Sequence, residues 1–282
     1  MFSRGLISAA DLNQKTILSL LSATHKNLKI STRKQGVLAF FEPSSRTKLN
    51  FELAGIDLGI QWLDFELENS SLKKGESFKD SIELFSNYPI DFLVLRHKDY
   101  GASFWSQHWL QKPVINAGEG SHEHPTQALG DALCLYELSK SKSWKICFYG
   151  DYLKSRVFRS CVQIFKKLNW QLYVCEDGQN ESQLLIKSFG LKSIKRTELK
   201  KMDIVYVLRV QKERGAESIL GALKMKDVAS KTQIMHAGPV MWGEDLEIAF
   251  QMEMERLLIQ RQVSSCYFIR RKLLSEVLGG SR

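Results

Sequence analysis

Short apolar runs alternate with helix-like stretches along most of the chain. Five runs of four or five apolar residues are typical of strands buried on both faces, namely 37–41, 92–95, 146–149, 172–175 and 204–208. Shorter candidates occur at 114–115 and 234–235. The stretches with helical character are 11–28, 47–55, 75–86, 125–139, 155–168, 181–189 and 243–260. This alternation predicts an α/β protein whose sheets are mostly parallel and flanked by helices.

The length of the chain predicts two domains. Its 282 residues exceed the size at which a single hydrophobic core stops growing. The polar Ser/Lys stretch at 139–144 falls between a predicted helix and a predicted strand, and we expect the junction there.

Composition narrows the class of protein. An apolar fraction of 44% with 10% aromatic residues excludes a disordered chain. Lys and Arg number 40 against 31 Asp and Glu, and the resulting net charge of +9 favours anionic partners. A nucleic-acid-binding protein fits that charge, but the chain lacks a recognised motif or interleaved basic and aromatic residues, so no nucleic acid is expected as partner.

Cysteine usage and hydropathy indicate the compartment. The five cysteines include no C-x-x-C pair, and Cys147 and Cys175 lie inside apolar runs, as expected for reduced, buried thiols. No secretory signal and no run of about 18 apolar residues is visible, so we expect a cytoplasmic protein with no membrane partner.

Polar residues follow the predicted strands, where ligands gather in parallel sheets. Ser44, Ser45, Arg46 and Thr47 lie between the first long strand and a helix, where free N–H groups and the helix dipole favour an anion. A simple serine N-cap beside a surface arginine is an equally good interpretation of this segment alone. The glycine spacing and lysine of a nucleotide-binding P-loop are missing, so ATP binding is not predicted.

His124 and Gln127 begin another predicted helix, with Pro125 at its first position. Their spacing of three places both on one helix face. A neutral imidazole that donates to a carbonyl oxygen is one function for His124, and a structural cap is the alternative. His122 and His124 lack a third ligand at suitable spacing, so no metal is predicted.

Three arginines follow strands or begin helices, namely Arg96, Arg156 and Arg209. Several arginines at one sheet edge suggest bidentate recognition of carboxylate or phosphate groups. No G-x-S-x-G elbow is present and no cysteine lies in a polar loop. Such a site suits a reaction that aligns two anionic reactants and stabilises developing negative charge.

Three segments together resemble the aspartate/ornithine carbamoyltransferase family: Phe40 to Thr47, Asn116 to Ser121 with His124 to Gln127, and Arg209 to Arg214. The Arg-Val-Gln-Lys-Glu-Arg run is similar to the aspartate-specific branch. The resemblance covers the chain from about Asp11 to the last helix.

The resemblance implies a carbamoyl phosphate-binding domain over 1–139, completed by a C-terminal helix at 265–282, and an aspartate-binding domain over 140–264. It implies transfer of the carbamoyl group from carbamoyl phosphate to L-aspartate, an early step of pyrimidine biosynthesis, with no cofactor. It also implies a homotrimer whose sites are shared between subunits, with possible regulatory or dihydroorotase-like subunits.

The family's functional residues carry over to matching positions. Carbamoyl phosphate binding is implied for Ser44, Ser45, Arg46, Thr47, Ser71, Arg96, His124, Gln127, Gly238 and Pro239. Aspartate binding is implied for Lys74, Arg156, Arg209 and Gln211. Catalytic roles fall to Arg46, Thr47, Lys74, Arg96 and His124, with Ser71 and Lys74 reaching the site of a neighbouring subunit. The departing phosphate is the expected general base.

Several positions depart from the family pattern. Ala237 replaces a proline, and the stretch 215–235 is short. The basic residue expected shortly after Pro239 is missing and is replaced among Val240, Met241 and Trp242. Ser264, Ser265 and Cys266 stand where an Asn-Gly turn is common. These changes predict weaker aspartate binding, so a catalytically weak paralogue that acts as a binding or assembly subunit is an alternative. An ornithine-specific enzyme is disfavoured because the Ser-Met-Gly motif and a cysteine after His236 are missing.

Overall fold

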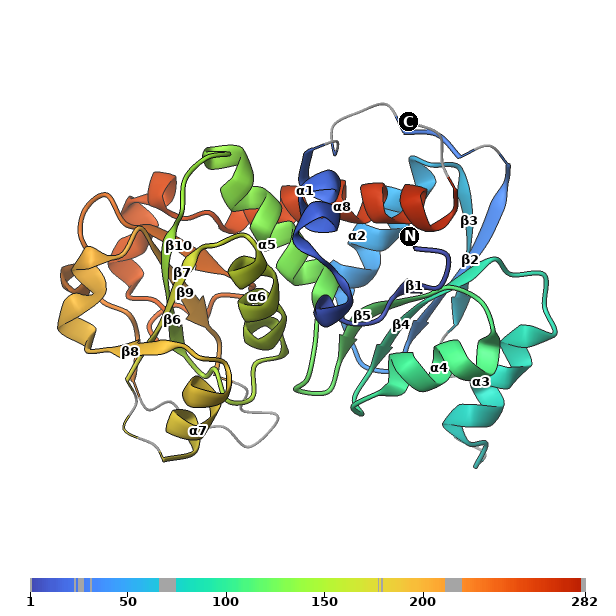
Figure 1. The fold of residues 1–282 in the computed structure, drawn as a ribbon, viewed down its shortest axis with the longest axis horizontal. Coiled ribbons are helices and arrows are strands. Elements are labelled where there is room, and N and C mark those ends of the chain that lie inside the picture. The colour runs from blue at the N-terminus through green and yellow to red at the C-terminus, as the bar shows by residue number, and fades with distance from the viewer. Residues whose placement is uncertain are drawn as a thin grey trace.

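The computed structural model describes residues 2–22, 24, 28–30, 32–65, 75–176, 178, 180–210 and 220–279. These residues form two parallel five-stranded sheets flanked by helices, which confirms the predicted fold class (Figure 1). The first sheet has the order β1-β5-β4-β2-β3, with bounds Gly5–Leu6 (β1), Lys34–Phe40 (β2), Ile60–Phe65 (β3), Phe92–His97 (β4) and Val114–Glu119 (β5). The second has the order β10-β9-β6-β7-β8, with bounds Lys145–Gly150 (β6), Gln171–Cys175 (β7), Lys192–Ile194 (β8), Ile204–Leu208 (β9) and Gln233–His236 (β10).

Eight α-helices connect or cover these strands in the described part of the chain. Their bounds are Gln14–Ser22 (α1), Ser45–Ile56 (α2), Phe78–Ser86 (α3), Ala102–Leu110 (α4), Pro125–Leu138 (α5), Arg156–Lys167 (α6), Asn180–Ser188 (α7) and Ile259–Val277 (α8). None of the described helices has the length and apolar character needed to cross a membrane.

Strand side chains alternate between two cores, as the period of two requires. In β2, Val37 and Ala39 pack with α3 and α4, whereas Leu38 and Phe40 join the core beneath α2, α5 and α8. Side chains of the second sheet are divided in the same way. One set packs on the face covered by α6, and the other packs against short 3-10 segments on the opposite face. The predicted buried runs are therefore strands because both of their faces are covered. All five cysteines are buried and free.

Helices α5 and α8 pack against each other and lie between the two sheets (Figure 1). Helix α5 also contacts α6 of the second sheet, and α8 also contacts α2 of the first. The end of the chain therefore returns to the N-terminal half. The domain boundary at 139/140 stays a prediction, and it falls between α5 and β6.

The helix predicted over 243–260 is wrong. That stretch forms two short 3-10 segments, Ile248–Met252 and Met254–Arg256, and α8 begins only at Ile259. Arg256 donates from Nε to the carbonyl of Thr232 and from Nη2 to that of Ala229, which ties the segment to the chain before β10. These long-range contacts override the helical pattern. The C-terminal helix likewise begins six residues before the predicted position of 265.

Four elements were absent from the sequence-based prediction, namely β1, β3, β8 and α4. Strand β1 has two residues and β8 has three, too few for a hydrophobic pattern. Strand β3 lies at the edge of its sheet. Helix α4 exposes the aromatic side chains of Phe104 and Trp105, so its sequence does not separate an apolar face from a polar face. The helix predicted over 11–28 is observed as α1, and it begins only at Gln14 because the Asn13 side chain caps it by accepting from the N–H of Thr16.

The strand order creates a switch point in each sheet. The chain leaves β2 toward β3 on one side and returns to β4 on the other, and β6 separates β7 from β9 in the same way. Loops that follow the strands on either side of a switch point diverge and leave a crevice at the carboxyl edge. The segments after β2, β4, β6 and β9 are those in which the sequence concentrates serines and arginines.

Candidate active site

A cavity of about 1440 Å³ lies between the carboxyl edges of both sheets. Every predicted site residue in the described part of the chain lines it, namely Ser44, Ser45, Arg46, Thr47, Arg96, His124, Gln127, Arg156, Arg209, Gly238 and Pro239. The predicted residues Ser71, Lys74 and Gln211 lie outside the described residues. Residues from six separate strand ends therefore meet at one place.

The start of α2 presents open donors to the cavity. Ser44 is the N-cap residue, yet its side chain makes no capping hydrogen bond to the described helix. The first N–H groups of α2 and its dipole can therefore act on an anion, together with the hydroxyl of Thr47. This geometry favours anion binding over the simple N-cap that the sequence left open.

Arg46 projects from the first turn of α2 toward the loop that follows β10, residues 236–239, which we call the late loop. Burial and then the neighbouring Arg209 lower the pKa of Arg46. A Cβ atom at Gly238 would lie 2.6 Å from Arg46 Nη1, and Gly238 has a φ of +65°. Only glycine accommodates both this backbone conformation and this close approach.

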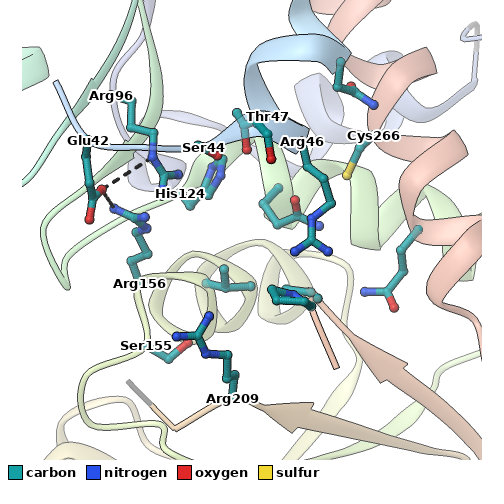
Figure 2. Close-up of a pocket in the computed structure, with 18 of the residues that line it drawn as sticks. Glu42, Ser44, Arg46, Thr47, Arg96, His124, Ser155, Arg156, Arg209 and Cys266 are labelled. Carbon is teal, nitrogen blue, oxygen red and sulfur yellow. Dashed lines mark hydrogen bonds and ion pairs between the residues drawn. The ribbon is translucent and has the colours of Figure 1, made fainter. Parts of the chain in front are cut away.

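Arg96 and Arg156 converge on Glu42 from the two sheets (Figure 2). Glu42 Oε2 lies 2.8 Å from Arg156 Nη1 and 3.4 Å from Arg96 Nε. Arg156 also donates to the carbonyl of Gly120, and Arg96 to that of Ala117. Glu42 thus joins the loop after β2 to the start of α6. This role of Glu42 was not predicted from the sequence, although Glu42 stands two residues before Ser44.

His124 is the N-cap residue of α5 and is 4% exposed. Desolvation, followed by Arg156, Arg96 and Arg270, holds its pKa well below the usual value of 6.5. The imidazole is therefore neutral near pH 7 and has one N–H to donate. Its main-chain N–H donates to Ser160 Oγ at 2.9 Å, which anchors the start of α5 to α6.

Arg209 enters the cavity from the end of β9, on the side opposite Arg46 (Figure 2). Arg156 and Arg209 follow strands of the second sheet. Arg46 follows a strand of the first sheet, and Arg96 lies at the end of another. The cavity therefore has cations contributed by both sheets, enough to bind more than one anionic group.

A fifth arginine, Arg270 on α8, also lines the cavity and was not predicted. It is 2% exposed, and its guanidinium carbon lies 5.0 Å from the ring centre of Phe51. Among the described residues, Nε and Nη2 of Arg270 have no hydrogen-bond partner. Three basic residues, Arg270, Arg271 and Lys272, stand in a row in the sequence, and no local signal distinguishes Arg270 among them.

The late loop is held by an ordered set of hydrogen bonds. His236 Nδ1 accepts from the N–H of Gly238 at 2.8 Å, and His236 Nε2 lies 3.2 Å from Asp245 Oδ2. The Gly238–Pro239 peptide is cis. Ala237, which replaces a family proline, also lines the cavity. Cys266, the other departure at this site, packs against α5 so closely that a Cβ at Gly130 would lie 2.4 Å from its Sγ.

Charge dominates the lining of the cavity. Its described lining has seven cationic side chains, Arg46, Arg96, Lys98, Lys154, Arg156, Arg209 and Arg270, and two carboxylates, Glu42 and Asp99. Across the described ranges, no three His, Cys, Asp or Glu side chains are grouped to hold a metal ion. The site can therefore align polyanionic reactants and stabilise an oxyanion with preformed donors.

Comparisons with known proteins agree with this chemistry. Residues 4–137 match the family described as aspartate/ornithine carbamoyltransferase, carbamoyl-P binding domain. The aspartate carbamoyltransferase catalytic subunit of Solibacter usitatus is 33% identical, with 98% of this chain and 96% of that protein covered. The corresponding subunit of Pelagibacter ubique is 32% identical, with 88% and 84% covered.

Solved structures extend the similarity to the whole fold. Aspartate transcarbamoylase from Trypanosoma cruzi, in complex with carbamoyl phosphate and aspartate, is 27% identical with a TM-score of 0.82. The alignment covers 98% of this chain and 97% of that one. The same enzyme in complex with N-(phosphonacetyl)-L-aspartic acid gives a TM-score of 0.83 at 27% identity, with 98% and 96% covered.

Proposed function

Because this chain belongs to the aspartate carbamoyltransferase family, we propose that it transfers the carbamoyl group of carbamoyl phosphate to the amine of L-aspartate. The products are N-carbamoyl-L-aspartate and phosphate, and the reaction is an early step of pyrimidine biosynthesis. One observation carries the proposal: cations from both sheets line one cavity, beside helix N-termini suited to phosphate.

The phosphate of carbamoyl phosphate binds at the start of α2. The N–H groups there, the hydroxyls of Ser44, Ser45 and Thr47, and Arg46 supply donors to its oxygens. The same groups stabilise the phosphate as it leaves. Arg46 stabilises the negative charge that the phosphate carries as it leaves.

The carbamoyl carbonyl oxygen lies among Arg96, His124 and Thr47. The aspartate amine attacks the carbonyl carbon, and negative charge develops on that oxygen. Donors that are fixed in advance in a water-poor site are typically worth roughly 3–4 kcal/mol each at such an oxyanion. His124 suits this task because its lowered pKa keeps the ring neutral, with the proton available for donation.

The two carboxylates of aspartate bind Arg156 and Arg209, with Gln211 near the amine. Arg156 is already oriented by Glu42 and by the carbonyl of Gly120, so little side-chain freedom is lost when aspartate binds. Glu42 is engaged by two arginines and is a poor proton acceptor. The departing phosphate therefore takes the proton from the attacking amine.

We propose that the active unit is a homotrimer in which a neighbouring subunit contributes Ser71 and Lys74 to each site. Support comes from α2, which leaves Leu49, Leu53 and Ile56 about half exposed beside the cavity. An exposed apolar helix face of this kind marks a surface that another subunit can cover, which removes the apolar side chains from water. The division of the chain into substrate domains at 139/140 and the cytoplasmic location are part of the same proposal.

The decisive experiment measures carbamoyl aspartate formation by the purified protein, with aspartate and ornithine compared at saturating carbamoyl phosphate. We expect turnover with aspartate alone, and its loss in Arg209→Ala. Binding of carbamoyl phosphate without turnover of either amino acid would instead support the binding or assembly subunit. The trimer is tested by mixing Arg46→Ala and Lys74→Ala subunits: shared sites regain activity, whereas self-contained sites stay inactive.

A further inference from the structure

A buried carboxylate lies directly behind the active site. Asp131 is on α5, one helical turn after Gln127, and is completely buried. Its Oδ2 accepts from the Tyr206 hydroxyl at 2.6 Å and lies 3.8 Å from Cys161 Sγ. Its Oδ1 accepts from Gln262 Nε2 at 2.8 Å and from Gln127 Nε2 at 3.0 Å. Donors from α5, α6, α8 and β9 therefore converge on one carboxylate.

This arrangement leaves the Gln127 amide one orientation. Burial raises the pKa of Asp131, and a proton on Oδ2 would face the Tyr206 hydroxyl, so Oδ1 remains an acceptor in either protonation state. A glutamine turned by 180° would place its own oxygen against Oδ1, two acceptors in contact without a proton between them. The amide nitrogen of Gln127 is thus held by Asp131, and its carbonyl oxygen is left for the cavity.

We propose that Asp131 is a positioning residue that makes this site select a carbamoyl group over an acyl group, an inference that rests on the proposed function. The carbonyl oxygen of Gln127 can accept a hydrogen bond from the amino group of carbamoyl phosphate. It can accept none from the methyl group that replaces this amino group in acetyl phosphate. A flipped Gln127 would present its NH₂ group instead, and the site would no longer favour carbamoyl phosphate over acetyl phosphate.

The same carboxylate is also connected to the loop after β10. Gln262 donates to Asp131, and its Oε1 accepts from the N–H of His236 at 2.9 Å. His236 in turn holds the N–H of Gly238. Asp131 is therefore the common point between Gln127 and the late loop, and both sides that face the carbamoyl group share one anchor.

The first arm of the test measures the orientation of Gln127 without altering Asp131. In Gln127→Leu, we expect the KM for carbamoyl phosphate to rise roughly tenfold, the loss of one buried hydrogen bond. The inhibition constant of acetyl phosphate, measured as a competitor of carbamoyl phosphate, should change by less than about twofold. If both constants rise equally, the amide nitrogen faces the substrate and the proposal is wrong.

The second arm tests whether Asp131 sets that orientation. Asp131→Ala should lower the ratio of acetyl phosphate to carbamoyl phosphate constants about as much as Gln127→Leu does. In the double variant the ratio should fall no further than in Asp131→Ala alone, because that change has already released the Gln127 amide. Tyr206→Phe is the matched control, since it removes another donor to the same carboxylate and should leave the ratio unchanged. Additive effects in the double variant, or an equal loss in Tyr206→Phe, would show a general structural role.

Failure of the proposed function can be distinguished from failure of the proposal about Asp131. A wild-type protein without carbamoyl aspartate formation contradicts the activity itself, whereas an active protein with an unchanged ratio in Asp131→Ala contradicts only the role of Asp131. If Asp131→Ala does not fold, the Gln127→Leu arm still decides the orientation.

Discussion

Glu42 is the side chain whose removal tests the electrostatic account of this site. Glu42→Gln keeps the shape of the side chain but removes the negative charge between Arg96 and Arg156. Both arginines are 9% exposed, and they share the cavity with three further arginines. Without Glu42, the two guanidinium groups face each other in a water-poor region, so the unliganded protein should lose stability.

The geometry bounds the size of this loss. At an effective dielectric constant of about 20, the 2.8 and 3.4 Å contacts correspond to gross attractions of roughly 6 and 5 kcal/mol. Desolvation cancels much of this, and removal of one partner from a buried pair typically costs about 3–5 kcal/mol. The Glu42 side chain is 23% exposed and glutamine retains a hydrogen bond, so we expect about 2–3 kcal/mol.

A double-mutant cycle on stability measures the effect. Glu42→Gln, Arg156→Met and the double variant are unfolded in urea without ligand. The double variant should be more stable than the summed losses predict, with a coupling of about 2 kcal/mol. Arg196→Met in place of Arg156→Met is the control, because Arg196 is held by Asp227 Oδ2 at 2.6 Å, away from the residues that line this cavity. Additive losses, or a Glu42→Gln protein as stable as wild type, would refute the electrostatic reasoning.

Three further predictions concern single residues. Arg209→Ala should lower kcat/KM for aspartate roughly 30–100-fold through a lost charged hydrogen bond, while the affinity for phosphate, measured by calorimetry, stays within about twofold. His124 has a folded-state pKa below its unfolded value of 6.5, so its contribution to stability is present above that pH and is lost as the pH falls toward the folded pKa. The Tm gap between wild type and the non-titrating His124→Asn should therefore shift against wild type between about pH 8 and about pH 5.5; a constant gap would contradict a buried neutral imidazole. Gly238→Ala should raise the KM for carbamoyl phosphate because its Cβ would lie 2.6 Å from Arg46 Nη1, and Gly243→Ala controls for backbone strain because it has a φ of +87° but open space. Equal KM values in these two variants would exclude the clash with Arg46.

The local features of the fold could be predicted from the sequence. Residues 37–41, 92–95 and 204–208 are apolar without interruption, and only a strand covered on both faces accommodates that composition. Boundaries and the late helix were less predictable. The pattern over 243–260 is compatible with a helix, but Arg256 finds carbonyl partners elsewhere in the fold, and these outweigh local preference.

Most of the candidate site could also be predicted, because parallel sheets place their functional loops at one edge and the sequence shows which loops carry serines and arginines. The strand order was not readable from the chain. Nor was the packing of the two sheets through α5 and α8, which brings the loops after β2 and β6 together, so that Glu42 meets Arg156, a residue 114 positions away. No local pattern reports such a pair.

The sequence by itself determined the α/β class, the anion-binding segments and the chemical character of the site, because these depend on short-range periodicity and on residue type. Tertiary structure alone decided which side chains act together: Arg270 beside Phe51, Glu42 between two arginines, and Asp131 behind Gln127. Hydrogen-bond direction and desolvation arise only after distant segments pack. The orientation of an amide or the pKa of a buried histidine therefore depends on the tertiary structure and not on any one segment of the sequence.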